Sequence, residues 1–168
     1  MTFADITIVP VPREGRARYL EFSRRMAEVY REHGATRIVD YWQAGGPADP
    51  DEFHADGVAY EPGELRGLAG VAAASDTEAV VVSITEWPSR AARDRGAAAA
   101  TADPRVLATL DEDPVFDGSR LIGESFELAM SVPAGTPEPP AAGAAPGTPE
   151  PPAAVFRPRG RTFGHEGE

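Results

Sequence analysis

The fold is decided by the stretch Glu78–Trp87, whose sequence is EAVVVSITEW. Its Val, Ile and Thr side chains branch at Cβ, and such residues favour the extended backbone of a sheet. Pro88 and Ser89 follow directly and indicate that the chain leaves the strand and begins a helix, with Ser89 as the N-cap. This segment is therefore the strand from which the other elements can be placed.

Upstream, the pattern predicts a strand, a helix and a second strand. Phe3–Val11 is rich in β-branched residues and ends among prolines, as a strand does. Apolar residues then recur at three- and four-residue steps from Gly15 to Glu32, which is the spacing of an amphipathic helix. Thr36–Gln43 reads TRIVDYWQ and is a further strand. Leu65–Ala74, in the irregular region that follows, is expected to contain a short helix.

Downstream, a helix that begins at Ser89 continues through Ala97–Ala100. A short helix is expected from Asp103 to Leu110, because Pro104 at its first position needs no hydrogen-bond partner. Leu121–Met130 is the last strand. The order β-α-β-β-α-β predicts an α+β, ferredoxin-like protomer, with a four-stranded antiparallel sheet and both helices on one face.

The alternation of side chains along the strands predicts two unlike sheet faces. The first is apolar, and we expect it to form the core; it carries Ile6, Ile8, Val39, Tyr41, Val80, Val82 and Ile84. The second mixes polar with apolar residues, among them Asp5, Asp40, Val81, Ser83 and Trp87. This mixed face is too apolar for a face washed by water. We therefore expect a second copy of the chain to cover it, which makes the protein a homodimer.

The C-terminal part differs from the rest in composition. Nine of the 17 prolines lie after residue 130, and an octapeptide occurs twice, at Gly135–Ala142 and Gly147–Ala154. Such a segment cannot build a core, so we expect a domain over residues 1–130 and a disordered Pro/Ala/Gly-rich tail over residues 131–168. The tail contains the Arg/Phe peptide Val155–Phe163. It is either a terminus without a role or a tethered peptide that docks on an acidic surface.

Composition excludes several classes of protein. The chain has 168 residues, 27 acidic against 16 basic side chains and a formal charge of −11, and it contains neither Cys nor Lys. Disulfide scaffolds, thiol enzymes, iron–sulfur proteins and Schiff-base lysine enzymes are therefore excluded. So acidic a chain is a poor partner for nucleic acid or an anionic membrane. Without a basic leader or a long apolar run, we expect a cytoplasmic protein.

Four segments together resemble the YbaA-like family of small bacterial proteins, which lies within the dimeric α/β-barrel superfamily. They contain VPVP at residues 9–12, EHGA and RIVDYW within 32–42, VVSITEWPSRAARD at 81–94 with ADPR at 102–105, and FDGSRLI at 116–122. The resemblance covers nearly all of residues 3–130. It departs from the family at Val115, where Pro is usual, and at Ile84, where Trp is usual. It implies a ferredoxin-like protomer, a homodimer and no known reaction.

The chain offers few candidates for chemistry. No two of His33, His54 and His165 have metal-ligand spacing, so we expect neither a metal nor a bound cofactor. His33 either complements a helix dipole or contacts a ligand. Asp117 is expected to form a tight turn, and Arg120 either pairs with a carboxylate or reaches a ligand anion.

Three hypotheses of function remain. The first is a protein that binds or transforms a small aromatic metabolite, either between sheet and helices or at a dimer interface. Its candidate ligand-binding residues are His33, Tyr41, Trp42, Trp87, Arg93, Asp117 and Arg120. The aromatic members alternate between faces and therefore cannot all line one pocket. The second hypothesis is a non-catalytic dimeric module whose tail recruits a partner, and the third is a protein without a ligand. The sequence singles out no catalytic residue.

Overall fold

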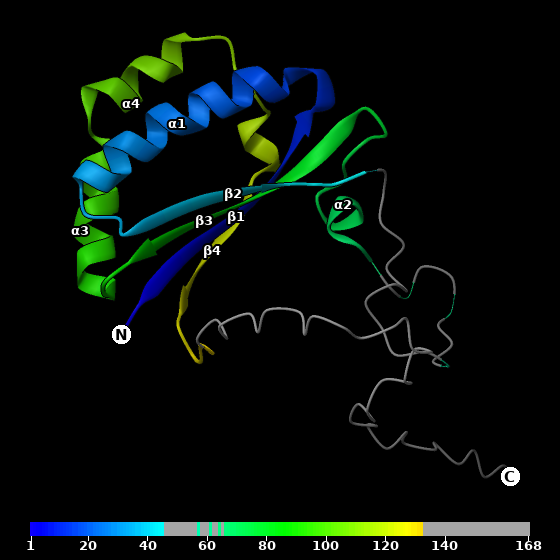
Figure 1. Ribbon diagram of the computed structural model, residues 1–168. Helices are drawn as coiled ribbons and strands as arrows, with labels where there is room; N and C mark the ends of the chain where they lie inside the picture. Colours follow the sequence, from blue (N-terminus) through cyan, green and yellow to red (C-terminus); the bar gives the residue numbers. More distant parts are fainter. Residues whose placement is uncertain (46–56, 58–60, 62–63, 65, 133–168) are drawn as a thin grey trace, which may run out of the picture. The chain divides into compact units, whose positions relative to one another are not determined.

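The computed structural model describes residues 1–45, 57, 61, 64 and 66–132 (Figure 1). Within them the predicted order of elements is present. The main elements are β1 (Phe3–Pro12), α1 (Arg16–Glu32), β2 (Arg37–Trp42), β3 (Glu78–Trp87), α3 (Arg90–Thr101) and β4 (Ile122–Glu127). Short helical segments lie between them: η1 (Arg13–Gly15), α2 (Leu68–Val71), α4 (Pro104–Ala108), η3 (Thr109–Asp111) and η4 (Gly118–Arg120).

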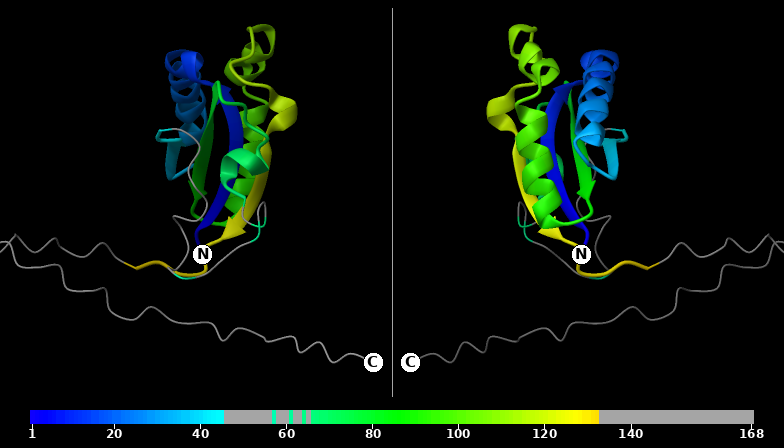
Figure 2. Two further views of the ribbon diagram at one scale, coloured as in Figure 1. Left: turned by 90° about the vertical axis from the view of Figure 1, so that its right-hand side faces the viewer. Right: turned by 90° about the vertical axis from the view of Figure 1, so that its left-hand side faces the viewer.

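The sheet has the strand order β2-β3-β1-β4, and every neighbouring pair is antiparallel. β1 and β3 form the centre, where Phe3 pairs with Trp87 and Val9 with Val81. α1 contacts α3, and both helices pack against this sheet (Figures 1 and 2). The arrangement is the α+β, ferredoxin-like fold that the order of elements predicts.

Local signals in the sequence place the helix starts. The hydroxyl of Ser89 accepts a hydrogen bond from the amide of Ala92, which caps α3 as predicted. The carboxylate of Asp103 accepts one from the amide of Arg105, and Pro104 occupies the first turn of α4. The expected ends shift slightly, because β4 stops at Glu127 instead of Met130 and α2 begins at Leu68.

α1 and α3 cover the mixed face of the sheet, so two expectations are wrong: the apolar face does not form the core, and the mixed face is not left for a second copy of the chain. Val9, Val81 and Trp87 belong to the mixed face, and each is at most 3% exposed. Tyr19 of α1 joins Val9 and Val81 in one buried cluster, while Trp87 is buried at the opposite end of the face. These two apolar ends supply the core, and the polar residues occupy the stretch between them.

The apolar face points away from α1 and α3, and we call it the open face. It carries Ile6, Ile8, Val39, Tyr41, Val82, Ile84, Ile122 and Phe126 by strand alternation. Tyr41 is 56% exposed and Phe126 46% exposed. α2 lies on this side of the sheet, near the beginning of β3 (Figure 1).

The described residues from Met1 to Ser131 belong to one unit. The proline-rich repeats, the Arg/Phe peptide and Leu65, on which parts of the sequence prediction rest, lie outside the described residues. In the part of the chain that is described, no helix is both long enough and apolar enough to cross a membrane.

Candidate functional site

Two rows of polar side chains cross the middle of the sheet beneath the helices. In one row Asp40 of β2 pairs with Ser83 of β3, and Ser83 pairs with Thr7 of β1. In the other row Asp5 of β1 lies between Thr85 on one side and Ser125 on the other. Packing of a helix on a sheet favours apolar side chains here, because a polar group without a partner is costly to bury. Polar residues in this position therefore indicate a site.

A cavity of about 560 Å³ lies between these polar rows and the two helices. Its volume falls within the usual range for pockets that hold small molecules. The helices contribute mostly apolar side chains, including Phe22, Met26 and Ala27 of α1 and Ala97 of α3. The cavity thus has a polar floor on the sheet and an apolar roof.

Gly123 of the edge strand β4 lines the cavity and sits opposite Thr7. A Cβ atom at position 123 would come within 2.9 Å of the methyl carbon of Thr7. A larger residue would therefore press against the floor. Glycine lets the edge strand pair closely while the side chain of Thr7 keeps its place.

Asp5 marks one end of the floor, where several donors surround its carboxylate. The Nε of Arg93 on α3 lies 2.9 and 3.0 Å from its two oxygens, and the indole nitrogen of Trp87 donates at 3.1 Å. The hydroxyl of Ser125 donates to the same carboxylate. Arg93 neutralises the charge of Asp5, and this ion pair connects α3 to the central strand.

Asp40 marks the other end of the floor. Its carboxylate accepts a hydrogen bond from the hydroxyl of Ser23 on α1. The hydroxyl of Tyr19 lies 3.3 Å from the Oγ of Ser83 beside it. Burial raises the pKa of Tyr19 to about 12, and the nearby negative charge of Asp40 contributes to that shift. Tyr19 therefore stays protonated at neutral pH and acts as a hydrogen-bonding phenol.

Aromatic rings form the wall beside Asp40. The ring centroids of Tyr19 and Phe116 are 6.2 Å apart, and those of Phe22 and Phe116 are 5.9 Å apart with nearly perpendicular planes. All three rings line the cavity. At the opposite end, burial raises the pKa of Tyr30, and the charge of Asp5 adds to this effect.

The structure brings only one of the sequence-predicted site residues into the cavity lining, and that residue is Arg93. Trp87 lies on the same face of the sheet as the floor, beyond its Asp5 end, and donates to Asp5 through its indole nitrogen. Trp42 packs edge-on against Tyr19, at 5.9 Å between centroids, and does not line the cavity. Tyr41 lies on the open face.

The remaining predicted residues lie outside the cavity. The imidazole Nε2 of His33, just past the end of α1, lies 3.2 Å from the carboxylate of Asp103. Asp117 accepts hydrogen bonds from Ser119 and caps η4. Arg120 makes an ion pair with Glu78 at 2.7 Å and donates to backbone carbonyls that follow α2.

Sequence reasoning missed most of the residues that line the cavity. Among them are Asp5, Thr7, Tyr19, Phe22, Ser23, Met26, Tyr30, Asp40, Ser83, Thr85, Phe116 and Ser125. One signal is present, because polar residues recur at alternate positions of the two central strands, Asp5 and Thr7 in β1 and Ser83 and Thr85 in β3. That signal becomes a site only when the register places those positions in adjacent rows.

The side chains of the cavity suit hydrogen bonding and charge recognition more than metal chemistry. Across the described residues, no three His, Asp or Glu side chains gather where they could hold a metal ion. The floor offers carboxylates and hydroxyls, and the roof offers apolar surface. This combination can bind a small molecule that has an apolar body and polar substituents along one edge.

The fold and cavity define a ferredoxin-like α+β protein with a pocket between its sheet and its helices. Residues 2–118 match the model of the family described as "Protein of unknown function (DUF1428)", and the chain belongs to this family. It is also 30% identical, over 127 residues, to the uncharacterized protein YbaA of Escherichia coli strain K12, spanning 76% of this chain and 96% of that protein.

Two solved structures show a similar fold at low sequence identity. One is a mutant of SnoaB, a cofactor-independent oxygenase from Streptomyces nogalater, with 14% identity and a TM-score of 0.43 over 79% of this chain and 98% of that one. The other is a dimeric ferredoxin-like protein from an uncultured marine organism, with 12% identity and a TM-score of 0.43 over 78% and 98%.

Proposed function

We propose that the protein binds a small organic molecule in the cavity between the sheet and α1 and α3. The observation that supports this most is the polar floor, in which hydroxyls and carboxylates occupy positions that helix packing would fill with apolar side chains. A protein whose only requirement is stability gains nothing from this arrangement. The proposal therefore assigns the polar rows to ligand recognition.

The chemistry of the lining indicates the kind of ligand. Phe22, Phe116 and Met26 offer a broad apolar surface, which suits an aromatic or alicyclic body. Tyr19, protonated at neutral pH, and Ser83 offer hydrogen bonds from the floor. The proposal includes no metal and no bound cofactor.

The experiment tests this proposal by filling the cavity with a larger side chain at a position in its roof. Ala97 of α3 lines the cavity, while its neighbour Ala98 is exposed and does not. We expect a panel of aromatic metabolites to contain compounds that raise the melting temperature of the wild type and of Ala98→Phe but not that of Ala97→Phe. Stabilisation of all three proteins by the same compounds, or of none by any compound, would contradict the proposal.

We also propose that a second copy of the chain covers the open face. Ile122 is 40% exposed and Phe126 46% exposed on β4, and Tyr41 of β2 is 56% exposed. These residues share the face with Ile6 and Ile84 of the central strands. An apolar sheet face of this kind is a typical protein interface. A copy of the same face, packed sheet on sheet, would match its apolar character.

A further inference from the structure

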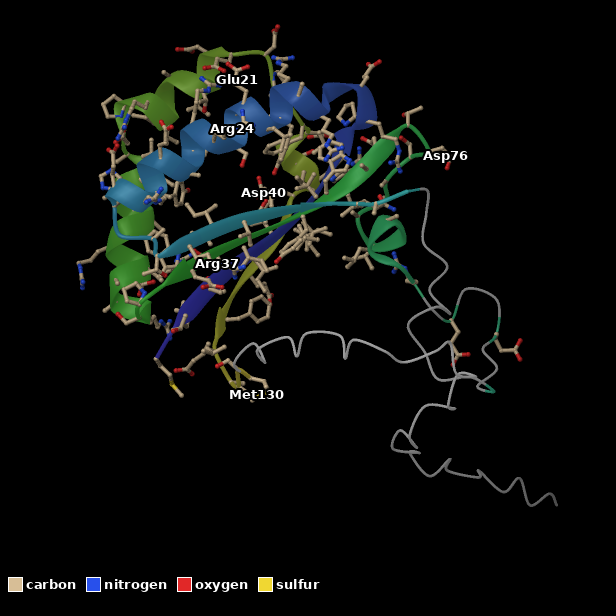
Figure 3. The ribbon with its side chains drawn as sticks, viewed as in Figure 1. Glu21, Arg24, Arg37, Asp40, Asp76 and Met130 are labelled. Atoms are coloured by element: carbon tan, nitrogen blue, oxygen red, sulfur yellow. The ribbon has the colours of Figure 1, made fainter. Side chains whose placement is uncertain are left out.

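The two acidic residues of the cavity floor are in different electrostatic situations. Asp5 has a cationic partner, Arg93, at 2.9 Å. Asp40 accepts a hydrogen bond from the neutral hydroxyl of Ser23 and takes part in none of the ion pairs formed within the described part of the chain. Figure 3 shows Asp40 on the side of β2 that faces α1, in the space between helix and sheet.

The charges around the cavity leave Asp40 uncompensated. The charged side chains that strand alternation and the lining place in the cavity are Asp5, Asp40 and Arg93, so two carboxylates share one guanidinium, while Glu124 alternates with Ile122 and Phe126 onto the open face. Arg93 forms hydrogen bonds to both carboxylate oxygens of Asp5 at the other end of the floor. A carboxylate that is half-buried without a cation lowers stability, and a positive charge beside it reverses that effect.

Aromatic rings gather at the same end of the cavity. Tyr19 lies close enough for the charge of Asp40 to contribute to its raised pKa, and Phe116 and Phe22 continue the wall. The face of an aromatic ring attracts a cation, and an organic ammonium group favours a site that combines such faces with a carboxylate. The negative charge and the aromatic wall thus point to the same kind of ligand group.

We propose that the ligand of this cavity is an organic cation, a protonated amine on an aromatic or aliphatic body, with its ammonium group paired to Asp40. This inference rests on the proposed function and adds the charge of the ligand to it. The apolar body then lies under Phe22 and Met26, and the Asp5–Arg93 pair closes the far end of the floor.

The experiment compares two probes that share one body and differ in charge. Phenethylamine and 2-phenylethanol are titrated by calorimetry at pH 7 into the full-length protein. We expect the amine to bind at least tenfold more tightly than the alcohol. In Asp40→Asn the amine should lose at least tenfold in affinity, while the alcohol binds as before, because Asn keeps an oxygen that accepts from Ser23.

Asp76→Asn is the matched control, because Asp76 is exposed, lies outside the cavity and loses the same charge (Figure 3). It should retain the preference for the amine. Equal affinity of amine and alcohol for the wild type would overturn the cation inference and leave the proposed function standing. A preference for the amine that persists in Asp40→Asn would likewise overturn the cation inference and leave the proposed function standing. Binding of neither probe at millimolar concentration would count against both proposals. If Asp40→Asn fails to fold, the ratio of affinities in the wild type still decides.

Discussion

At the scale of single residues, Gly96 shows how closely α3 approaches the sheet. A Cβ atom at this position would lie 2.3 Å from the Trp87 ring and 2.5 Å from the backbone oxygen of His33. Trp87 has little freedom to move, since it is fully buried and donates to Asp5, and the other neighbour is a backbone atom. Gly96 therefore fixes the distance between helix and strand at the Asp5 end of the cavity.

Replacing Gly96 by Ala should overpack the core, which usually costs about 1–3 kcal/mol. Alanine is more favourable than glycine in a helix by about 1 kcal/mol, so we expect a net destabilisation of up to about 2 kcal/mol. Denaturant unfolding measures the change. Gly70→Ala is the control, because nothing lies within 4 Å of a Cβ atom there. A Gly96→Ala variant as stable as Gly70→Ala would show that α3 can shift away without cost.

At the scale of elements, the sequence predicts the order and the boundaries well because their signals are local. β3 matches its prediction from Glu78 to Trp87, and Ser89 caps α3 as expected. Which face of the sheet packs against the helices is not a local property, because it depends on what covers each face. Hydrophobic alternation predicts that Val82 and Ile84 are buried. It does not tell whether a helix of the same chain or another protein molecule buries them.

An ion pair joins the beginning of β3 to η4 and to the backbone after α2. Arg120 donates to the carboxylate of Glu78 at 2.7 Å and to the carbonyl of Ala73 at 2.6 Å. The bond from Arg120 is the main reason that the pKa of Glu78 falls to about 2, from an ordinary value of 4.5. The ionised form of Glu78 is therefore favoured in the folded state more than in the unfolded chain.

The Glu78 carboxylate should accordingly stabilise the fold above about pH 4.5, and this contribution should disappear as the pH falls towards 2. At pH 7 we expect Glu78→Gln to be less stable than the wild type by about 2 kcal/mol, the range for hydrogen bonds to charged groups. Near pH 2 the two proteins should unfold alike. Thermal unfolding between pH 2 and 7 measures this, with Asp76→Asn as the exposed control. A difference that does not depend on pH would refute the assignment.

At the scale of the whole molecule, the candidate site could be predicted only in part. The sequence predicts Arg93 as a ligand-binding residue, and Arg93 lines the cavity. Asp5 and Asp40 are 35 positions apart in the chain, and only the antiparallel register brings them onto one floor. Two of the predicted aromatic residues lie outside the cavity, because Tyr41 is on the open face and Trp87 donates to Asp5 from beyond the end of the floor.

The open face predicts how the molecule assembles. A charge placed among its apolar side chains should separate two copies, because an unpaired carboxylate within an apolar interface is costly. We expect the wild type to sediment as a dimer at micromolar concentration and Ile84→Asp to sediment as a monomer. Leu110→Asp, at a position 79% exposed on η3, should stay dimeric. A monomeric wild type, or an Ile84→Asp variant that still dimerises, would contradict this arrangement.

The central claim is that a small molecule occupies the space between the sheet and α1 and α3. Isotope-filtered nuclear Overhauser effects between unlabelled phenethylamine and the labelled full-length protein test it most directly. We predict contacts from the phenyl protons to the methyl groups of Met26 and Ala97, which line the cavity roof. Contacts confined to the methyl groups of Ile6, Val82 or Ile84 would place the ligand on the open face and contradict the account.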